Sequence, residues 1–412
     1  MEKLIRLGDI VTYNKGYAFK STEYCDEGVM VVRISDFTTE SVSIDNAVFI
    51  DERDEFQKYR LNEGDILIQT VGSWANNPKS IVGKIIRVPK ECKNAYLNQN
   101  IVRIIAKEGI DNSYLYYALK ANKFSEYCVI RGQGAANQAS ITLNTVFRFK
   151  LKLPDYDSQK LISNIISQYD EQIKINSRKI KILETLSLEI YKEWFVRFRF
   201  PGYENVEHVA GVPKTWKLTK LGEIIDIDRG LSYTSEEIDC DDGTDLVNLK
   251  NIQSFGGYRL DGTKKYSGNY KNSHIVKTGD LIMGITDMTQ DRRTVGSVAL
   301  IPIIHNTSVI SADLIKITSH ISNYYLYAMF RYGNVSKYIS QFANGANVLH
   351  LRPQVVNKIK VYLPPLKLIE AFSELFKPIV DKINLLNEMN KNLIKQRDLL
   401  IPRLMSGNLK VV

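Results

Sequence analysis

The chain of 412 residues contains only four cysteines, and no two of them form a Cys-x-x-Cys pair. Cys25, Cys92, Cys128 and Cys240 lie far apart, which fits neither a zinc site nor a disulfide framework. We therefore expect reduced thiols. No apolar run approaches the roughly 18 residues that a membrane-spanning helix needs, and the N-terminus lacks the apolar core of a signal peptide. These absences predict a cytoplasmic protein.

Motifs for catalysis are also missing. A phosphate-binding Gly-x-x-x-x-Gly-Lys-Ser/Thr loop does not occur. The one Pro-Pro pair follows Leu363 and precedes Leu366, so it lacks the flanking residues with which adenine methyltransferases hold a base. The acidic run from Asp51 to Glu55 is typical of a solvated turn. The five histidines show no metal-ligand spacing, so we predict neither a catalytic residue nor a metal site in this chain; they are His208, His274, His305, His320 and His350.

The charge of the chain is unbalanced towards the basic side. Its 55 lysines and arginines exceed its 46 aspartates and glutamates, which gives a formal net charge of +9. This charge suits a polyanionic partner, and its combination with 23 tyrosines favours nucleic acid over a membrane. Charge alone would fit a basic surface without a ligand equally well.

Most of the sequence occurs twice. The repeated strings are Leu7-Gly8-Asp9-Ile10 and Leu221-Gly222-Glu223-Ile224, Lys15-Gly16 and Arg229-Gly230, Gly64-Asp65-Ile66-Leu67 and Gly279-Asp280-Leu281-Ile282, Tyr114-Leu115-Tyr116 and Tyr325-Leu326-Tyr327, Gly134-Ala135 and Gly345-Ala346, and Leu153-Pro154 and Leu363-Pro364. Their spacing stays nearly constant, so one long unit is duplicated, and a unit of this length excludes a solenoid of short repeats. Two copies of one module are expected to bind two similar targets.

Each copy mixes short β-branched runs with a helix, which predicts an α+β domain followed by a long helical segment. The helix of the first copy is expected from about Ser113 to Tyr127. After Leu153-Pro154 and Leu363-Pro364 the period becomes helical. We predict domains at 1–155 and 201–365, the second with a linker at 201–211, and helical spacers at 156–200 and 366–412.

Both helical segments carry the alternating four- and three-residue spacing of a coiled-coil seam. The first seam contains Ile162, Ile166, Tyr169, Ile173, Asn176, Ile180, Leu183, Ser187, Ile190 and Trp194. The second contains Phe372, Phe376, Ile379, Ile383, Leu386, Asn390, Leu393, Arg397, Leu400 and Leu404.

Each seam contains one asparagine. If the helices are antiparallel and Asn176 faces Asn390, every seam position meets a seam partner, and the two amides satisfy each other while fixing the register. We predict this contact; the alternative is that both asparagines lie on solvated faces. Pro378 predicts that the second helix begins there, and Pro402 predicts a kink or an end.

Three strings resemble motifs of the specificity subunit of type I restriction-modification enzymes. Lys192-Glu193-Trp194-Phe195-Val196-Arg197-Phe198 with Pro201-Gly202 is similar to the end of that family's central helix. Gly211-Val212-Pro213-Lys214-Thr215-Trp216 is similar to the opening of its second target-recognition domain, and Leu399-Leu400-Ile401-Pro402-Arg403-Leu404-Met405-Ser406-Gly407 to the end of its last helix. The order of domain, helix, domain and helix spans the whole chain. The first domain lacks the Pro-x-x-Trp lead-in of the second.

The resemblance implies two α+β target-recognition domains separated by long helices that form an antiparallel coiled coil with pseudo-twofold symmetry. Each domain would read one half of a bipartite DNA target, and the helices would set the gap. Methyltransferase subunits, usually two, would dock on the chain and flip and methylate adenine with S-adenosylmethionine. Restriction subunits would add ATP- and Mg-dependent translocation and cleavage. This chain itself would bind no cofactor and catalyse nothing.

Residues that read bases are expected in loops where the two copies differ. Amides suit adenine edges and arginines suit guanine edges. The candidates in the first copy are Gln69, Ser73, Trp74, Asn76, Asn77, Lys79, Arg131, Gln133, Asn137 and Gln138. Those in the second are Thr286, Gln290, Arg292, Arg293, Asn344, Asn347, His350 and Arg352. Glycine-rich loops of this kind can also be plain connectors.

Two other functions remain open at this stage. One is a stand-alone DNA-modifying enzyme, against which the missing motifs count. The other is a coiled-coil adaptor that does not read DNA, and it predicts no salt-dependent DNA affinity.

Overall fold

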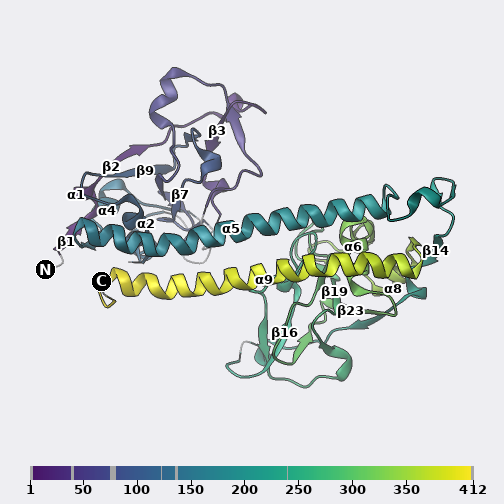
Figure 1. The fold of residues 1–412 in the computed structure, drawn as a ribbon. Helices are drawn as coiled ribbons and strands as arrows, with labels where there is room; N and C mark the ends of the chain where they lie inside the picture. Colours follow the sequence, from purple (N-terminus) through teal and green to yellow (C-terminus); the bar gives the residue numbers. More distant parts are fainter. Residues whose placement is uncertain are drawn as a thin grey trace. The chain divides into compact units, whose positions relative to one another are not determined.

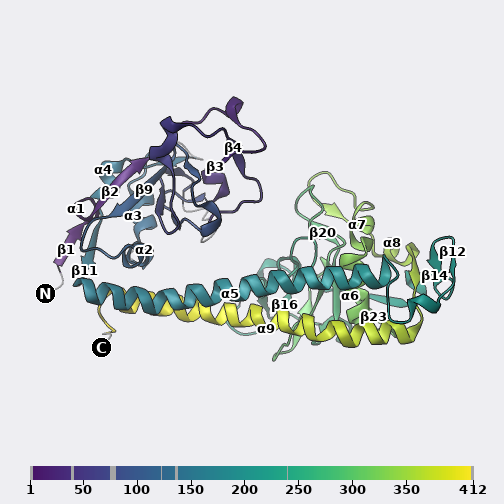
Figure 2. The same ribbon diagram turned by 45° about the horizontal axis from the view of Figure 1, so that its top comes forward.

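The computed structural model describes residues 3–38, 41–74, 80–121, 123–134, 138–238 and 240–409. The chain divides into two compact units: unit 1 comprises Met1–Gln172 and Leu393–Val412, and unit 2 comprises Ile173–Asn392. Each unit contains one α+β domain and a part of each long helix, as the ribbons in Figures 1 and 2 show. The domain boundaries stated above stay a prediction, because the compact units divide both helices.

Unit 1 is built on a four-stranded antiparallel sheet in the order β2-β9-β5-β7. A three-stranded sheet, β4-β3-β8, and the pairs β1-β11 and β6-β10 complete its strands. The strands are β1 (Lys3–Arg6), β2 (Val11–Lys15), β3 (Val29–Val32), β4 (Val48–Ile50), β5 (Ile66–Gln69), β6 (Val71–Gly72), β7 (Ile85–Arg87), β8 (Tyr96–Leu97), β9 (Ile101–Ala106), β10 (Ala139–Ser140) and β11 (Lys150–Leu153). The short helices are α1 (Leu7–Ile10), α2 (Asn112–Ala121), α3 (Phe124–Ile130) and α4 (Leu143–Phe147).

Unit 2 repeats this plan. Its sheets follow the orders β15-β23-β19-β21 and β17-β16-β22-β18, and β14-β25, β20-β24 and β12-β13 are pairs. The strands are β12 (His208–Val209), β13 (Val212–Pro213), β14 (Lys217–Lys220), β15 (Ile225–Arg229), β16 (Thr244–Val247), β17 (Lys264–Tyr266), β18 (Ile275–Val276), β19 (Leu281–Gly284), β20 (Thr286–Asp287), β21 (Val298–Leu300), β22 (Ser308–Ile310), β23 (Leu314–Ser319), β24 (Leu349–His350) and β25 (Lys360–Leu363). The short helices are α6 (Asn323–Tyr332), α7 (Val335–Ser340) and α8 (Pro353–Lys358).

The duplicated strings occupy equivalent elements, so the predicted internal repeat and the α+β class are confirmed. One detail differs: the helix expected from Ser113 to Tyr127 is two helices. Lys123 between them has a φ of 53°, and Asn334 between α6 and α7 has a φ of 60°. A residue in this left-handed conformation ends one helix and lets the next begin in a new direction.

The long helices are α5 (Tyr156–Phe195) and α9 (Leu366–Met405). In unit 1 the first part of α5 lies beside the last part of α9, and in unit 2 the last part of α5 lies beside the first part of α9, so the helices are antiparallel in both (Figures 1 and 2). All predicted seam residues are buried or half-buried. In unit 2, Asn176 Nδ2 donates to Asn390 Oδ1 at 2.9 Å, which is the predicted contact.

The prediction that the second helix begins at Pro378 is wrong, because α9 begins at Leu366 and continues through this proline. Pro378 lies on the exposed side of the helix, where the carbonyl that loses its N–H partner can face water. On the opposite side Phe372 and Phe376 are fully buried and hold the first turns in place. The other proline, Pro402, lies in the last turns before the helix ends at Met405.

The core of each unit lies between its main sheet and the long helices. In unit 2, Phe195 of α5 and Phe372 of α9 pack at 4.8 Å between ring centroids, and both belong to the cluster that includes the buried residues of α6 and the sheet. In unit 1, Ile166 of α5 and Leu404 of α9 belong to the corresponding cluster. Each domain is therefore anchored on a part of both helices.

Candidate nucleic-acid interface

In each unit, the two candidate loops lie next to each other. In unit 1, β6 pairs with β10, which brings the loop after Gln69 against the loop that contains Gln133. In unit 2, β20 pairs with β24, and Thr286 lies opposite His350. These loops were predicted as separate candidates, and the strand pairs bring them together as one candidate site in each unit.

Asp287 holds the loop that follows β20. Its Oδ1 accepts hydrogen bonds from the backbone N–H and the hydroxyl of Thr289, both at 2.9 Å, and its Oδ2 accepts one from the backbone N–H of Thr294 at 2.7 Å. Burial would raise the pKa of Asp287, but the backbone hydrogen bonds from Thr294 and Thr289 outweigh it and the pKa is lowered. A buried, charged carboxylate therefore fastens both ends of this loop.

Three of the predicted residues in unit 2 make contacts that shape the site. Gln290 Nε2 donates to the carbonyl of Ala346 at 2.9 Å and so connects the two loops. Arg292 Nε donates to the carbonyl of Ser340 at 3.1 Å. Thr286 is buried and its hydroxyl lies 3.5 Å from His350 Nδ1, so the prediction that Thr286 reads bases does not fit its place in this structure.

The other predicted residues in unit 2 are exposed: Arg293, Asn344, Asn347, His350 and Arg352. Arg293 forms an ion pair of 2.6 Å with Asp291 at the surface, and Asn344 Nδ2 donates to the carbonyl of Phe342. A surface ion pair of this kind contributes little and is easily exchanged for a DNA contact. These five side chains stay candidates for DNA contacts.

In unit 1, Gln69 is fully buried and its Nε2 donates to the carbonyls of Val71 at 2.9 Å and Ser80 at 2.8 Å. Gln69 therefore supports this loop from inside, and its buried position does not fit the predicted base contact. Ser73 lies with its hydroxyl 3.0 Å from that of Ser80. Trp74, like Ser73, is half-buried.

At the second loop of unit 1, the guanidinium of Arg131 lies 4.1 Å from the ring centroid of Tyr127. Gln133 and Ser140 exchange backbone hydrogen bonds of 2.8 Å, and Gln133 and Gln138 are exposed. The remaining candidates lie outside the described residues; they are Asn76, Asn77, Lys79 and Asn137.

The repeated glycine of the second loop has the same function in both units. Gly134 has a φ of 148° and Gly345 a φ of 153°. A Cβ would lie 2.0 Å from the carbonyl oxygen of Gln138 in the first case and 1.8 Å from that of Val348 in the second. Both copies therefore keep a glycine where the backbone approaches itself too closely for a Cβ, while the side chains around this position differ.

A hollow of about 430 Å³ adjoins the β20-β24 pair of unit 2. Arg229, at the end of β15, lines it together with His350 and Arg352. Sequence reasoning missed Arg229 as a site residue, although the Lys15-Gly16 and Arg229-Gly230 repeat contained the signal. Among the described lining residues of this hollow there is no carboxylate.

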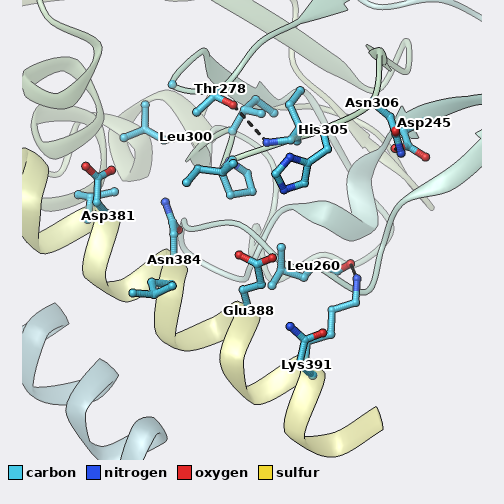
Figure 3. Close-up of a pocket in the computed structure, with 18 of the residues that line it drawn as sticks. Asp245, Leu260, Thr278, Leu300, His305, Asn306, Asp381, Asn384, Glu388 and Lys391 are labelled. Atoms are coloured by element: carbon cyan, nitrogen blue, oxygen red, sulfur yellow. Dashed lines mark hydrogen bonds between the residues drawn. The ribbon is translucent and has the colours of Figure 1, made fainter. Parts of the chain in front are cut away.

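A second pocket in unit 2, of about 310 Å³, has the opposite electrostatic character. Figure 3 shows Asp381, Asn384 and Glu388 of α9 along one side of it and the loop with His305 along the other. Asp245 adds a third carboxylate. Its carboxylates outnumber its one lysine, Lys391, so this pocket suits a phosphate less well than the basic hollow does.

In each unit a hydrogen bond to a carboxylate of α5 attaches the α+β domain to this helix. In unit 1, Asp170 of α5 accepts from Arg397 of α9 at 2.7 Å and from the hydroxyl of Tyr117 in α2 at 2.5 Å. Burial, followed by the charge of Asp170, raises the pKa of Tyr117. In unit 2, Arg331 of α6 donates to Glu184 of α5 at 2.8 Å. Helix α5 is thus bonded to α2 in unit 1 and to α6 in unit 2, which occupy equivalent places in the two copies.

No group of three or more His, Cys, Asp or Glu side chains within the described residues could hold a metal ion. None of the helices in the described part of the chain combines the length and the apolar content that crossing a membrane requires.

The duplicated fold with one divergent loop cluster per unit defines a two-domain recognition protein. A family model of the type I restriction modification DNA specificity domain matches residues 2–185 and 213–396, so the chain belongs to this family and contains its domain twice.

Named relatives agree with this assignment. The type I restriction enzyme MjaVIII specificity subunit of Methanocaldococcus jannaschii is 23% identical over 436 residues, which cover 99% of this chain and 93% of that protein. The HindI specificity subunit of Haemophilus influenzae is 23% identical over 368 residues, covering 72% and 77%. The crystal structure of a type I restriction-modification S subunit from M. genitalium has the same fold, with a TM-score of 0.63 at 15% identity, and covers 100% of this chain and 96% of that one.

Proposed function

We propose that this chain is the DNA specificity subunit of a type I restriction-modification enzyme and that each unit reads one half of a bipartite target. The observation that carries the proposal is the double occurrence of the family's DNA specificity domain. In each copy the strand pair β6-β10 or β20-β24 joins two loops of divergent sequence. A common scaffold with different loops is what two different half-sites require.

The chemistry of the loops suits the reading of base edges. Unit 1 exposes the amides of Gln133 and Gln138, and amides pair with adenine in the major groove. Unit 2 exposes Arg293, and arginine pairs with guanine. Unit 1 also exposes Arg131, and unit 2 also exposes the amides of Asn344 and Asn347, so both kinds of base contact are available to each unit.

The long helices offer surfaces for partner subunits. In unit 2, Ile182 and Leu186 of α5 are 67% and 45% exposed, and Leu385 and Met389 of α9 are 48% and 41% exposed. Each pair is spaced by one helical turn, so each forms a short apolar stripe on the outside of its helix. We propose that methyltransferase subunits, two per chain, dock on such stripes, and that restriction subunits join this complex in the cytoplasm.

The chemistry of the complex would belong to those partners. They would bind S-adenosylmethionine, ATP and Mg²⁺, and this chain would supply the DNA sequence at which they act. Its contribution is to position and orient the target base relative to the methyltransferase subunits.

Mapping of methylated adenines in a host that contains this chain and its methyltransferase partners tests the proposal. We expect one bipartite motif with an unread gap, which disappears when the gene for this chain is deleted. A host whose methylated motif is unchanged by the deletion would show that the chain does not read DNA, as expected for an adaptor. Methylation by the purified chain without partners would show a stand-alone enzyme.

A further inference from the structure

We infer that the hollow of Arg229, His350 and Arg352 binds a phosphate of the DNA backbone and that Lys15 makes the equivalent contact in unit 1. This inference rests on the proposed function and deepens it, because it separates residues that hold DNA from residues that read it. The hollow, defined by these three basic side chains, adjoins the predicted reading loops of unit 2.

The three basic side chains of the hollow come from two segments of the chain. Arg229 ends β15, His350 ends β24, and Arg352 follows it. All three are exposed, while Ile285 and Leu351 beneath them are each only 3% exposed. The backbone N–H of Leu351 donates to the carbonyl of Ile285 at 2.8 Å, which fixes this floor. Two arginines and a histidine above a buried apolar floor are positioned to bind an anion without first reorganising.

The charge of the hollow is not neutralised from within. Among its described lining residues no carboxylate occurs, in contrast to the pocket of Figure 3. Arg229 Nε donates to the carbonyl of Ala312 at 3.2 Å, which orients the guanidinium and leaves its other N–H groups for a ligand. A phosphate accepts such hydrogen bonds in a bidentate manner.

The internal repeat distinguishes a phosphate contact from a base contact. Lys15 occupies in unit 1 the place of Arg229 in unit 2, and it is exposed as well. The glycines that follow make equivalent hydrogen bonds. The Gly16 N–H donates to the carbonyl of Ile101 and the Gly230 N–H donates to the carbonyl of Leu314, both at 3.1 Å. The reading loops differ between the copies, but this position is basic in both. A contact kept in both copies serves what both half-sites share, and that is the sugar-phosphate backbone.

The experiment measures the affinity of the chain, assembled with its methyltransferase subunits, for target and unrelated duplexes over a range of KCl concentrations. For Arg229→Ala we expect the slope of log affinity against log salt to become less steep by about one. Binding to both duplexes should weaken by a similar factor, roughly threefold to tenfold at moderate salt, because one counterion fewer is released. Lys15→Ala should behave in the same way, and Arg229→Lys should keep the wild-type slope.

Arg259→Ala serves as the control, since it removes the same charge from unit 2 at an arginine that is already paired with Asp261 at 2.7 Å. Its slope should remain that of the wild type. If the wild type binds its target and Arg229→Ala has the same salt slope, the phosphate contact of Arg229 is refuted while the proposed function stands. A changed base preference in the methylated motif of Arg229→Ala would also overturn it, because Arg229 would then read a base. If the wild-type complex has no bipartite motif, the proposed function fails first.

Discussion

Asn176 of α5 donates a hydrogen bond of 2.9 Å to Asn390 of α9, and both side chains are buried, with 1% and 9% of their surface exposed. Asn390 in turn donates to the hydroxyl of Ser177 at 3.3 Å. The two amides thus satisfy each other inside the seam between the helices. This contact sets which turn of α5 faces which turn of α9 in unit 2.

Replacing Asn176 by isoleucine should destabilise the protein, because the buried carbonyl oxygen of Asn390 loses its donor. We expect a loss of about 1 to 3 kcal/mol, measured as a lower midpoint of urea unfolding. The double variant Asn176→Ile with Asn390→Leu should recover most of this loss, since both polar groups are then gone. The exposed Asn392→Ala is the matched control. Equal midpoints for the wild type and Asn176→Ile would contradict the assigned contact.

The pair of Arg397 and Asp170 should stabilise unit 1. The side chain of Arg397 is only 3% exposed, whereas that of Asp170 is 31% exposed and also accepts from Tyr117. Arg397→Met should therefore lower the free energy of unfolding by on the order of 2 kcal/mol. This is less than the loss expected when a fully buried ion pair is broken, because water and Tyr117 still solvate the carboxylate of Asp170. Thermal unfolding measures this, with the exposed Arg403→Met as the control. A Tm equal to that of the control would show that the ion pair contributes nothing.

Asp287 should control the order of the reading loop in unit 2. Asp287→Asn removes the negative charge that accepts hydrogen bonds from Thr289 and Thr294. The backbone amides of these two residues should then exchange hydrogen faster, because the free energy of local opening falls by about 2 kcal/mol. Asp291→Asn, at the surface of the same loop, should leave this protection intact. Hydrogen exchange followed by mass spectrometry reports both. Unaltered protection in Asp287→Asn would mean that the carboxylate does not hold the loop.

The same carboxylate gives the loop a dependence on pH. The pKa of Asp287 is lowered in the folded protein, so its stabilisation is fully present above the unfolded pKa of about 4. It is lost as the pH falls through the lower folded-state pKa. A titration of Asp287 by NMR should therefore show an inflection below that of an unfolded peptide. An inflection above pH 4 would reverse the sign and contradict the hydrogen bonds described here.

The four free cysteines should differ sharply in reactivity. Burial raises the pKa of Cys92 to about 11 and that of Cys128 to about 12, so neither forms the reactive thiolate near neutral pH. Cys25 is exposed. Iodoacetamide at pH 8 should label Cys25 and leave Cys92 and Cys128 unmodified until the protein unfolds, as peptide mass spectrometry can measure. Labelling of Cys128 as fast as that of Cys25 would contradict the burial.

The sequence predicted those features that depend on periodicity or repetition. The duplication located equivalent strands, and the seam spacing placed Asn176 opposite Asn390. The start of α9 was missed because a sequence does not show that Pro378 faces water while Phe372 and Phe376 hold the helix from the other side.

The site was harder to predict, because polar residues in loops look alike until their surroundings are known. Gln69 and Gln138 have the same side chain, yet Gln69 is buried under a loop and Gln138 is exposed. Arg229 lies far in sequence from His350 and Arg352, and only the sheet brings β15 near the β20-β24 pair. The sequence shows that Lys15 and Arg229 are equivalent, but it does not show that Arg229 lies beside the reading loops.

The central claim is that each unit reads its own half of one bipartite DNA target. The most direct test replaces residues 1–150 by the equivalent domain of another specificity subunit and maps methylated adenines in a host that contains the methyltransferase partners. The account predicts a new motif in which one half has changed and the other half is retained. A motif that remains unchanged, or one in which both halves change, would contradict it.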